Sequence, residues 1–128
     1  MDEHKGADDF AALTEKVIAG GFAVSNTLGC GFLEKVYENA LAHELRKAGM
    51  RVRQQCPVRV TYDGVIVGDY AADLLVEDRL LIELKAVRAL DNVHFAQCLN
   101  YLKATGLRVC LLMNFGRPRL ELRRIRND

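Results

Sequence analysis

The segment from Asp73 to Lys85 carries two carboxylates and a lysine at a spacing that two neighbouring strands would bring together. It reads DLLVEDRLLIELK, and its second half alternates apolar and polar side chains with the period of a strand that buries one face. If the three residues after Val76 form the connecting loop, Val76 opposes Leu80 and Asp73 lies opposite Glu83. Lys85 then shares their face, two residues further along the strand. This register predicts an acidic pair with an amine beside it.

Such a set of side chains suits phosphodiester hydrolysis assisted by a divalent metal. Two facing carboxylates repel each other unless a cation or a proton lies between them. Hard oxygen ligands favour Mg²⁺ or Mn²⁺, which often take phosphate oxygens as further ligands. The amine of Lys85 would stabilise charge on a phosphate or help to position and deprotonate the attacking water. Two alternatives stay open: Glu-x-Lys is common on the solvated face of an ordinary strand, and a two-residue loop would turn Asp73 away from Glu83.

A predicted helix over residues 31–48 offers a third carboxylate. At about 100° per residue, Glu34 falls at the edge of the apolar stripe, where it needs a partner such as a hydrated metal ion or Lys85. Glu44 projects into the same stripe, so periodicity does not choose between the two glutamates. An acid in the first turn is also favoured simply by the helix dipole.

A later predicted helix, over residues 92–105 with Asp91 as its N-cap, aligns three polar side chains on one strip. His94, Gln97 and Tyr101 stand at positions i, i+3 and i+7. A Gln and a Tyr four residues apart could hold a phosphate, a base edge or a metal-bound water. A Tyr packed at the margin of the core and a solvated Gln would give the same pattern.

The remaining pattern predicts three helices and five strands. Helices are predicted over residues 9–25, 31–48 and 92–105, and strands over residues 51–62, 65–76, 80–87, 107–115 and 119–125. Asp63-Gly64 predicts a tight hairpin turn, and Gly20-Gly21 weakens the first helix. The order α-α-β-β-β-α-β-β predicts one domain over residues 1–128, α/β in class, with a mixed central sheet flanked by helices. Residues 1–8 are predicted to form a disordered tail.

Basic residues cluster in the sequence although the formal net charge is only +1. The stretch over residues 46–59 contains no acidic residue and holds Arg46, Lys47, Arg51, Arg53 and Arg59. The segment over residues 117–128 holds five arginines against two acids. Such segregation predicts a cationic surface beside an acidic pocket, which suits a nucleic-acid backbone. Charges that merely solvate exposed faces would give the same pattern.

The cysteines and the first residues bear on location. The four cysteines are Cys30, Cys56, Cys98 and Cys110, and they show no CxxC spacing. Because the first ten residues are polar and acidic rather than a secretory leader, we expect a cytoplasmic protein with reduced thiols. The longest unbroken apolar run, residues 109–113, is too short to span a bilayer, so no membrane partner is expected.

The order and spacing of these motifs resemble the PD-(D/E)XK nuclease superfamily, particularly its branch with a Q-x-x-x-Y helix. The residues that carry this resemblance follow in strand, strand and helix order: Asp73, Glu83-x-Lys85 and Gln97-x-x-x-Tyr101. A further motif is similar to the signature of the small bacterial GxxExxY family assigned to that superfamily: Gly31-x-x-Glu34-x-x-Tyr37. The resemblance covers nearly the whole chain.

The resemblance implies a restriction-endonuclease-like αβββαβ core, here with an extra N-terminal helix and an extra C-terminal strand. It implies Mg²⁺ or Mn²⁺ held by Asp73 and Glu83, with Glu34 completing the metal shell directly or through water. Lys85 would be the catalytic lysine of this site.

The resemblance also implies a nucleic-acid substrate, DNA in the first place with RNA as an open alternative. Gln97 and Tyr101 would support the site or the scissile phosphate, His94 would contact the leaving strand, and the basic stretch would follow the backbone. A rival from another class is a catalytically silent module that binds nucleic acid or docks a partner. The last predicted strand is a candidate edge strand, through which a homodimer or a complex with a partner protein could form.

Overall fold

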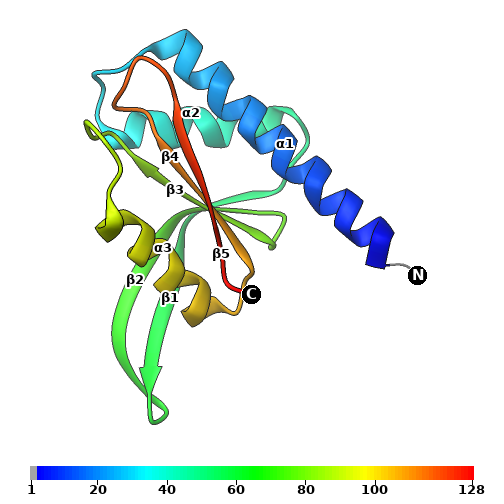
Figure 1. Ribbon diagram of the computed structural model, residues 1–128, viewed down its shortest axis with the longest axis vertical. Coiled ribbons are helices and arrows are strands. Elements are labelled where there is room, and N and C mark those ends of the chain that lie inside the picture. Colours follow the sequence, from blue (N-terminus) through cyan, green and yellow to red (C-terminus); the bar gives the residue numbers. More distant parts are fainter. Residues whose placement is uncertain (1–2) are drawn as a thin grey trace.

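Five strands form one mixed sheet in the order β1-β2-β3-β4-β5 (Figure 1). The computed structural model describes residues 3–128, with side chains from residue 9 onward. The strands are β1 (Val52–Tyr62), β2 (Val65–Val76), β3 (Leu80–Lys85), β4 (Val109–Asn114) and β5 (Glu121–Arg126). Only β3 and β4 are parallel among these neighbouring pairs. A parallel pair needs a crossover, and α3 (Asn92–Thr105) supplies it.

Helices cover both faces of the sheet. α1 (Glu3–Leu28) and α2 (Glu34–Lys47) pack on one face, where they bury side chains such as Leu74 and Ile82. α3 packs on the opposite face, over Leu81 and Leu112. The order of elements confirms the predicted restriction-endonuclease-like αβββαβ core with an extra N-terminal helix and an extra C-terminal strand. β5 is an outer strand of the sheet, as predicted.

The first helix is longer than the sequence predicts. It begins at Glu3 rather than at residue 9, so residues 3–8 are helical and the predicted disordered tail over residues 1–8 is wrong for them. Residues 1 and 2 lie outside the described residues. No proline interrupts this segment, so nothing in it forces the helix to stop. At the other end the helix continues to Leu28.

The glycine pair inside α1 permits close packing instead of breaking the helix. A Cβ atom on Gly20 would lie 2.9 Å from Leu45 Cδ2 of α2, and one on Gly21 would lie 3.0 Å from Met113 Sδ of β4. Side chains at these two positions would push α1 away from its neighbours, because cores are packed without spare volume. Tertiary packing therefore overrides the weak helix propensity of glycine.

The other boundaries agree with the sequence to within a few residues. α3 spans the predicted range, because Asp91 and His94 form a reciprocal capping box and Gly106 closes the helix in the left-handed conformation. α2 begins at Glu34 rather than at Gly31, whose φ of +117° is not helical. β3 ends at Lys85. No helix in the described part of the chain combines the length and apolarity needed to cross a membrane.

Candidate active site

The two predicted acidic strands separate at the position of the acids. The pairs Val76↔Leu80 and Leu74↔Ile82 confirm the three-residue loop and the register that it implies. The ladder between β2 and β3 ends at the second of these pairs, one step before Asp73 and Glu83. Beyond it, β2 turns away with β1 as a hairpin that leaves the sheet (Figure 1). The two carboxylates therefore lie in the fork between diverging strands.

In this fork, where the β2–β3 ladder has ended, each carboxylate accepts a hydrogen bond from a backbone amide. The amide of Asp73 donates to Glu83 Oε2 at 2.7 Å, and the amide of Leu84 donates to Asp73 Oδ2 at 2.8 Å. One oxygen of each acid is thereby fixed. No described donor reaches Glu83 Oε1, yet no described buried side-chain oxygen lacks a partner, so this atom must contact solvent. One oxygen of each acid is thus held by a backbone amide, and Glu83 Oε1 remains accessible to a ligand.

The strand on the other side of Asp73 is also irregular. Gln55 of β1 is missing from the ladder between the pairs Gln54↔Leu74 and Cys56↔Ala72, and its φ is +55°. Residues two apart on a regular strand share a face, but Leu74 packs under α1 and α2 whereas Ala72 packs under α3. The hairpin thus changes face at Asp73. A left-handed non-glycine residue costs about 1–2 kcal/mol, and such backbone strain is often found at functional sites.

Burial makes both acids hard to ionise, and the charge of Asp73 adds to this effect at Glu83. Glu83 is only 3% exposed. Its burial, followed by the charge of Asp73, raises its pKa from 4.5 to about 8. Burial also raises the pKa of Asp73, against the lowering effect of the Leu84 amide. A nearby cation would favour the charged form of both groups, so the electrostatics of this pair fit a positively charged ligand.

Glu34 lies close to this pair without joining it. Partial burial raises the pKa of Glu34, Lys85 lowers it and Asp73 raises it again, so Glu34 is within electrostatic reach of both residues. Among the described residues, however, no three His, Cys, Asp or Glu side chains are grouped closely enough to hold a metal ion by themselves. The donor chemistry of Asp73 and Glu83 fits a hard divalent cation, and Mg²⁺ and Mn²⁺ keep several water ligands. Among the described residues, Glu34 is therefore not grouped with Asp73 and Glu83 closely enough to complete a three-residue metal site.

Tyr37 explains how the Gly31-x-x-Glu34-x-x-Tyr37 motif places Glu34. Its hydroxyl donates to the carbonyl of Gly29 at 2.7 Å and accepts from the amide of Phe32 at 3.2 Å. Its ring is buried and stacks on Phe115 with centroids 4.9 Å apart. The loop before α2 is thereby fixed to the core, and α2 begins at Glu34. Glu44, the other candidate on this helix, pairs instead with Lys47 at the far end of α2.

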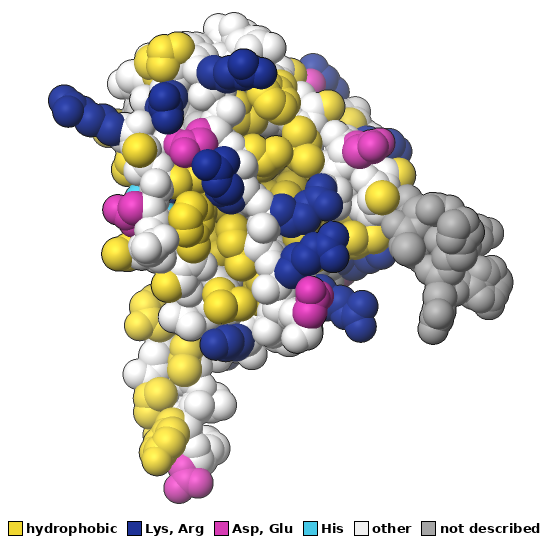
Figure 2. All heavy atoms as spheres, viewed as in Figure 1, with side chains coloured by type: hydrophobic (Ala, Val, Ile, Leu, Met, Phe, Trp, Pro, Cys, Tyr) yellow, Lys and Arg dark blue, Asp and Glu magenta, His cyan; other side chains and the backbone are white. Residues whose placement is uncertain are grey.

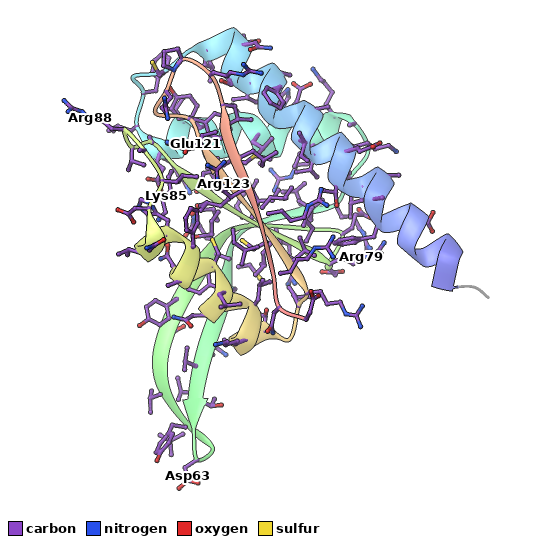
Figure 3. The ribbon with its side chains drawn as sticks, viewed as in Figure 1. Asp63, Arg79, Lys85, Arg88, Glu121 and Arg123 are labelled. Atoms are coloured by element: carbon purple, nitrogen blue, oxygen red, sulfur yellow. The ribbon has the colours of Figure 1, made fainter. Side chains whose placement is uncertain are left out.

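Lys85 ends β3, and its strand is anchored just beyond it. The amide of Phe115 donates to the carbonyl of Lys85 at 2.8 Å, and the side chain of Asn114 accepts from the amide of Val87 and donates to its carbonyl, both at 2.9 Å. Asn114 is fully buried and also donates to Glu121 at 3.0 Å. Figure 3 shows Lys85 beside the start of α3, on the side of the molecule where the fork opens. Asn114 therefore supports the segment that carries the lysine.

Two functional candidates were not predicted from the sequence. Glu38, one turn after Glu34, is 4% exposed and accepts from Lys35, Gln54 and Gln55 at 2.8–2.9 Å. The same amide of Gln55 also reaches Asp73 Oδ1 at 3.4 Å. Glu38 and Gln55 thus link α2 to the metal-binding candidate Asp73. The i, i+4 spacing of the two glutamates was the only sequence signal, and it is equally typical of a solvated helix face.

Gln97 and Tyr101 contact each other beside the fork. Gln97 Nε2 donates to Tyr101 Oη at 3.2 Å. Burial and then the charge of Glu83 raise the pKa of Tyr101, which places the phenol within electrostatic reach of that acid. His94 instead serves the helix: its Nδ1 accepts from the amide of Asp91 at 3.1 Å in the capping box. Its predicted contact with nucleic acid stays a prediction.

Most residues of the predicted cationic stretch contact an acid or another acceptor in three dimensions. Arg51 lies 3.5 Å from Glu77 and 3.7 Å from Asp78, and Arg53 lies 3.2 Å from Asp78. These acids lie in the turn between β2 and β3. Two other members are engaged as well, as Arg46 donates to the carbonyl of Val52 and Lys47 pairs with Glu44. Arg59 makes only a long, exposed contact with Asp69, at 3.9 Å, and lies beside the helix of Gln97 and Tyr101.

Comparison with known proteins provides an independent line of information. A family model described as the PD-(D/E)XK nuclease superfamily matches residues 11–125. Among solved structures, the chain is similar to an alkaline exonuclease (LHK-Exo) from Laribacter hongkongensis, with a TM-score of 0.54 and 19% identity over 73% of this chain and 56% of that one. LHK-Exo in complex with dAMP gives a TM-score of 0.50 and 15% identity over 90% and 83%. No curated protein matches the chain.

The structural likeness concerns the fold, and this chain spans 56% of the length of the first of the two exonuclease chains. The family match is broader, because residues 11–125 include α2, the fork and α3 together. The elements that carry the acids, the lysine and the Gln-Tyr pair all lie within the matched region. This chain therefore belongs to the PD-(D/E)XK nuclease superfamily.

Proposed function

We propose that this chain is a divalent-metal-dependent nuclease that hydrolyses phosphodiester bonds of DNA. The observation that carries the proposal is the pair of carboxylates in the fork, each held through one oxygen by a backbone amide. Lys85 follows Glu83 by two residues on the same strand. A simple ion pair, or a strand face that only contacts water, would not explain why both acids accept backbone amides at the point where the β2–β3 ladder ends.

The roles of the residues follow from their positions. Asp73 and Glu83 would hold Mg²⁺ or Mn²⁺, with Glu34 reaching the ion through water. When bound, such an ion polarises a phosphate oxygen and lowers the pKa of a water molecule. Lys85 orients the attacking water or neutralises charge that develops on the phosphate. Gln97 and Tyr101 hold the phosphate from the side of α3.

The loop before α2 supports a narrower assignment, to the GxxExxY family. In this chain the tyrosine of that signature fixes the loop that contains Gly31, and the glutamate is the first residue of the helix that follows. In this proposal, the signature would serve to bring Glu34 near the fork.

Cleavage assays with Mg²⁺ or Mn²⁺ on single- and double-stranded DNA test the proposal. We expect metal-stimulated cleavage by the wild type and a loss of about 100-fold or more in Lys85→Ala, the range found when one charge-stabilising group is removed from an active site. Lys16→Ala is the matched control, because Lys16 is an exposed lysine on α1. It should cleave like the wild type.

The rival function, a silent module that binds nucleic acid or a partner, gives a different result. It predicts salt-sensitive DNA binding without cleavage by either metal. Absence of cleavage in the wild type, or equal cleavage by the wild type and Lys85→Ala, would reject the nuclease.

A further inference from the structure

A groove of about 830 Å³ lies between α3 and the hairpin formed by β1 and β2. Its size is within the range of small-molecule and cofactor sites. Gln97 and Tyr101 form part of its wall, so the groove begins where the candidate active site ends. The hydrolysis of a phosphodiester bond does not itself require such a groove. The residues that line it indicate which kind of ligand would fit.

One wall of the groove offers an aromatic ring. The ring of Tyr70 lies 5.9 Å from that of Tyr101 at an angle of 43°, and Tyr70 is 53% exposed. Gly68, two residues earlier on the same strand, has no side chain, and a Cβ there would come within 3.0 Å of the Tyr70 ring. The strand thus makes room for the ring on the face that points to α3. The ring of Tyr70 thus packs near Tyr101 on one side and remains exposed to solvent elsewhere.

The hairpin carries this ring outward from the sheet. Figure 2 shows hydrophobic side chains along the projecting hairpin, and Figure 3 shows Asp63 at its tip. Tyr62, next to that tip, is 75% exposed and does not line the groove. The two tyrosines therefore share one hairpin and an open environment but differ in their distance from the groove.

Polar and cationic groups complete the lining. Asn100 and Gln97 place two amides along α3, which can donate to and accept from a base edge. Arg59 from the hairpin and Lys103 from α3 supply two positive charges on opposite walls. Arg59 lies 3.9 Å from Asp69, but both side chains are exposed, so water and salt screen this contact. A ligand with a flat ring, amide-like edges and a negative backbone matches all three features.

We propose that this groove binds an unpaired nucleotide of single-stranded DNA, with its base on Tyr70 and its phosphates between Arg59 and Lys103. Stacking on an aromatic side chain requires a base whose face is not covered by its neighbours in a duplex. The groove therefore selects single strands, overhangs or frayed ends over blunt duplex. That it feeds such an end to the fork rests on the proposed function, whereas binding itself does not.

Fluorescence anisotropy in EDTA tests the binding directly, because no cleavage occurs without metal. The probes are a labelled short oligothymidylate and a labelled blunt hairpin duplex. We expect Tyr70→Ala to bind the oligothymidylate about tenfold more weakly, as one lost stacking interaction implies, with no change on the duplex. Tyr70→Phe keeps the ring and should bind like the wild type. Tyr62→Ala is the matched control and should also be unchanged.

Three results would overturn the inference. The first is a wild type that binds the oligothymidylate no better than the blunt duplex. The second is equal loss in Tyr70→Ala and Tyr62→Ala, which would make the hairpin a general contact or the site of another partner. The third is equal weakness of Tyr70→Phe and Tyr70→Ala.

A metal-dependent cleavage assay distinguishes failure of the nucleotide-binding proposal from failure of the proposed nuclease function. If Tyr70→Ala binds oligothymidylate like the wild type while cleavage still depends on Lys85, the groove is wrong and the nuclease stands. If Tyr70→Ala loses binding but the wild type cleaves nothing, the groove stands and the nuclease is wrong.

Discussion

Asp73 and Glu83 are held in an arrangement that is costly for two carboxylates. Each accepts a backbone amide, which favours its charged form, but burial and repulsion outweigh this in Glu83 and raise its pKa to about 8. A protein gains nothing in stability from such a pair. A cation bound between the two carboxylates would offset this unfavourable free energy, because each carboxylate would be attracted to the cation.

The pH dependence of stability should reveal this cost. Because the pKa of Glu83 is higher in the folded protein than its ordinary value of 4.5, the folded state binds the proton more tightly. In metal-free buffer the wild type should lose stability as the pH rises from about 5 to 8, by a few kcal/mol at most. Glu83→Gln lacks this titration and should show a flatter curve. Thermal melting across this range in EDTA measures both. Parallel curves for the two proteins would contradict the prediction.

Metal affinity should rank the acids by their place in the fork. Glu83→Gln should abolish measurable Mn²⁺ binding, because it removes one of the two fixed carboxylates. Glu34→Gln should weaken binding only about tenfold, the low end of what the loss of an indirect partner costs. Titration calorimetry with Mn²⁺ compares them. The opposite ranking would mean that Glu34 holds the metal directly and that Glu83 plays the supporting role.

At the scale of elements, the site depends on where three elements end or break. β2 leaves β3 at Asp73, α2 starts at Glu34, and β3 stops at Lys85. None of these boundaries is set by the catalytic candidates alone. Tyr37 fixes the start of α2 and Asn114 fixes the chain after β3, so buried polar groups outside the fork determine the geometry inside it.

Tyr37→Phe should therefore lower both stability and activity. Removal of the hydroxyl removes its hydrogen bonds to the carbonyl of Gly29 and the amide of Phe32, at a cost of about 0.5–1.5 kcal/mol. Cleavage should fall because the loop that sets the position of Glu34 loosens. Denaturant unfolding and the cleavage assay measure the two effects. The exposed Tyr62 provides the control, since Tyr62→Phe should change neither stability nor cleavage. A fully active Tyr37→Phe would show that the loop before α2 does not control the geometry of the site.

The sequence predicts elements well where the signals are local. Asp91 and Gly106 mark the ends of α3 to the residue, and the alternation around a three-residue loop predicts the register in which Val76 opposes Leu80 and Leu74 opposes Ile82. It fails where the determinant is distant. The left-handed Gln55 and the change of face at Asp73 arise between two strands, and a period-two pattern read within one strand does not locate them.

Charge shows the same limit of local reading. Arg51 and Arg53 stand in a stretch without acids, yet they meet Glu77 and Asp78 from a turn about 25 residues away. Likewise, Glu38 reads as a solvated helix residue until β1 is placed against α2. The pairing of strands, which decides these contacts, is the part of the fold that composition and periodicity leave open.

For the molecule as a whole, basic and acidic residues nearly balance, with a formal net charge of +1. The basic residues that are paired with acids contribute little to the field, whereas Arg59 and Lys103 lie on the groove that leads to the fork. Figure 2 shows Lys and Arg side chains spread over this face, with fewer Asp and Glu among them. Under the proposed function, a few side chains beside α3 would set the path of the substrate.

The salt dependence of DNA binding should distinguish these arginines. Arg59→Ala should reduce the slope of log affinity against log salt by about 1, the effect of one lost phosphate contact. Arg51→Ala should change it less, because Glu77 and Asp78 already neutralise that residue. Anisotropy titrations at several salt concentrations in EDTA measure the slopes. A larger change in Arg51→Ala would place the DNA on the β2–β3 turn instead.

The most direct test of the account is a crystal grown with Mn²⁺ and measured at a wavelength where manganese scatters anomalously. We predict an anomalous peak between the carboxylates of Asp73 and Glu83, with Lys85 at its side. A crystal in which Mn²⁺ binds elsewhere, while these two acids contact only the backbone and water, would contradict the account.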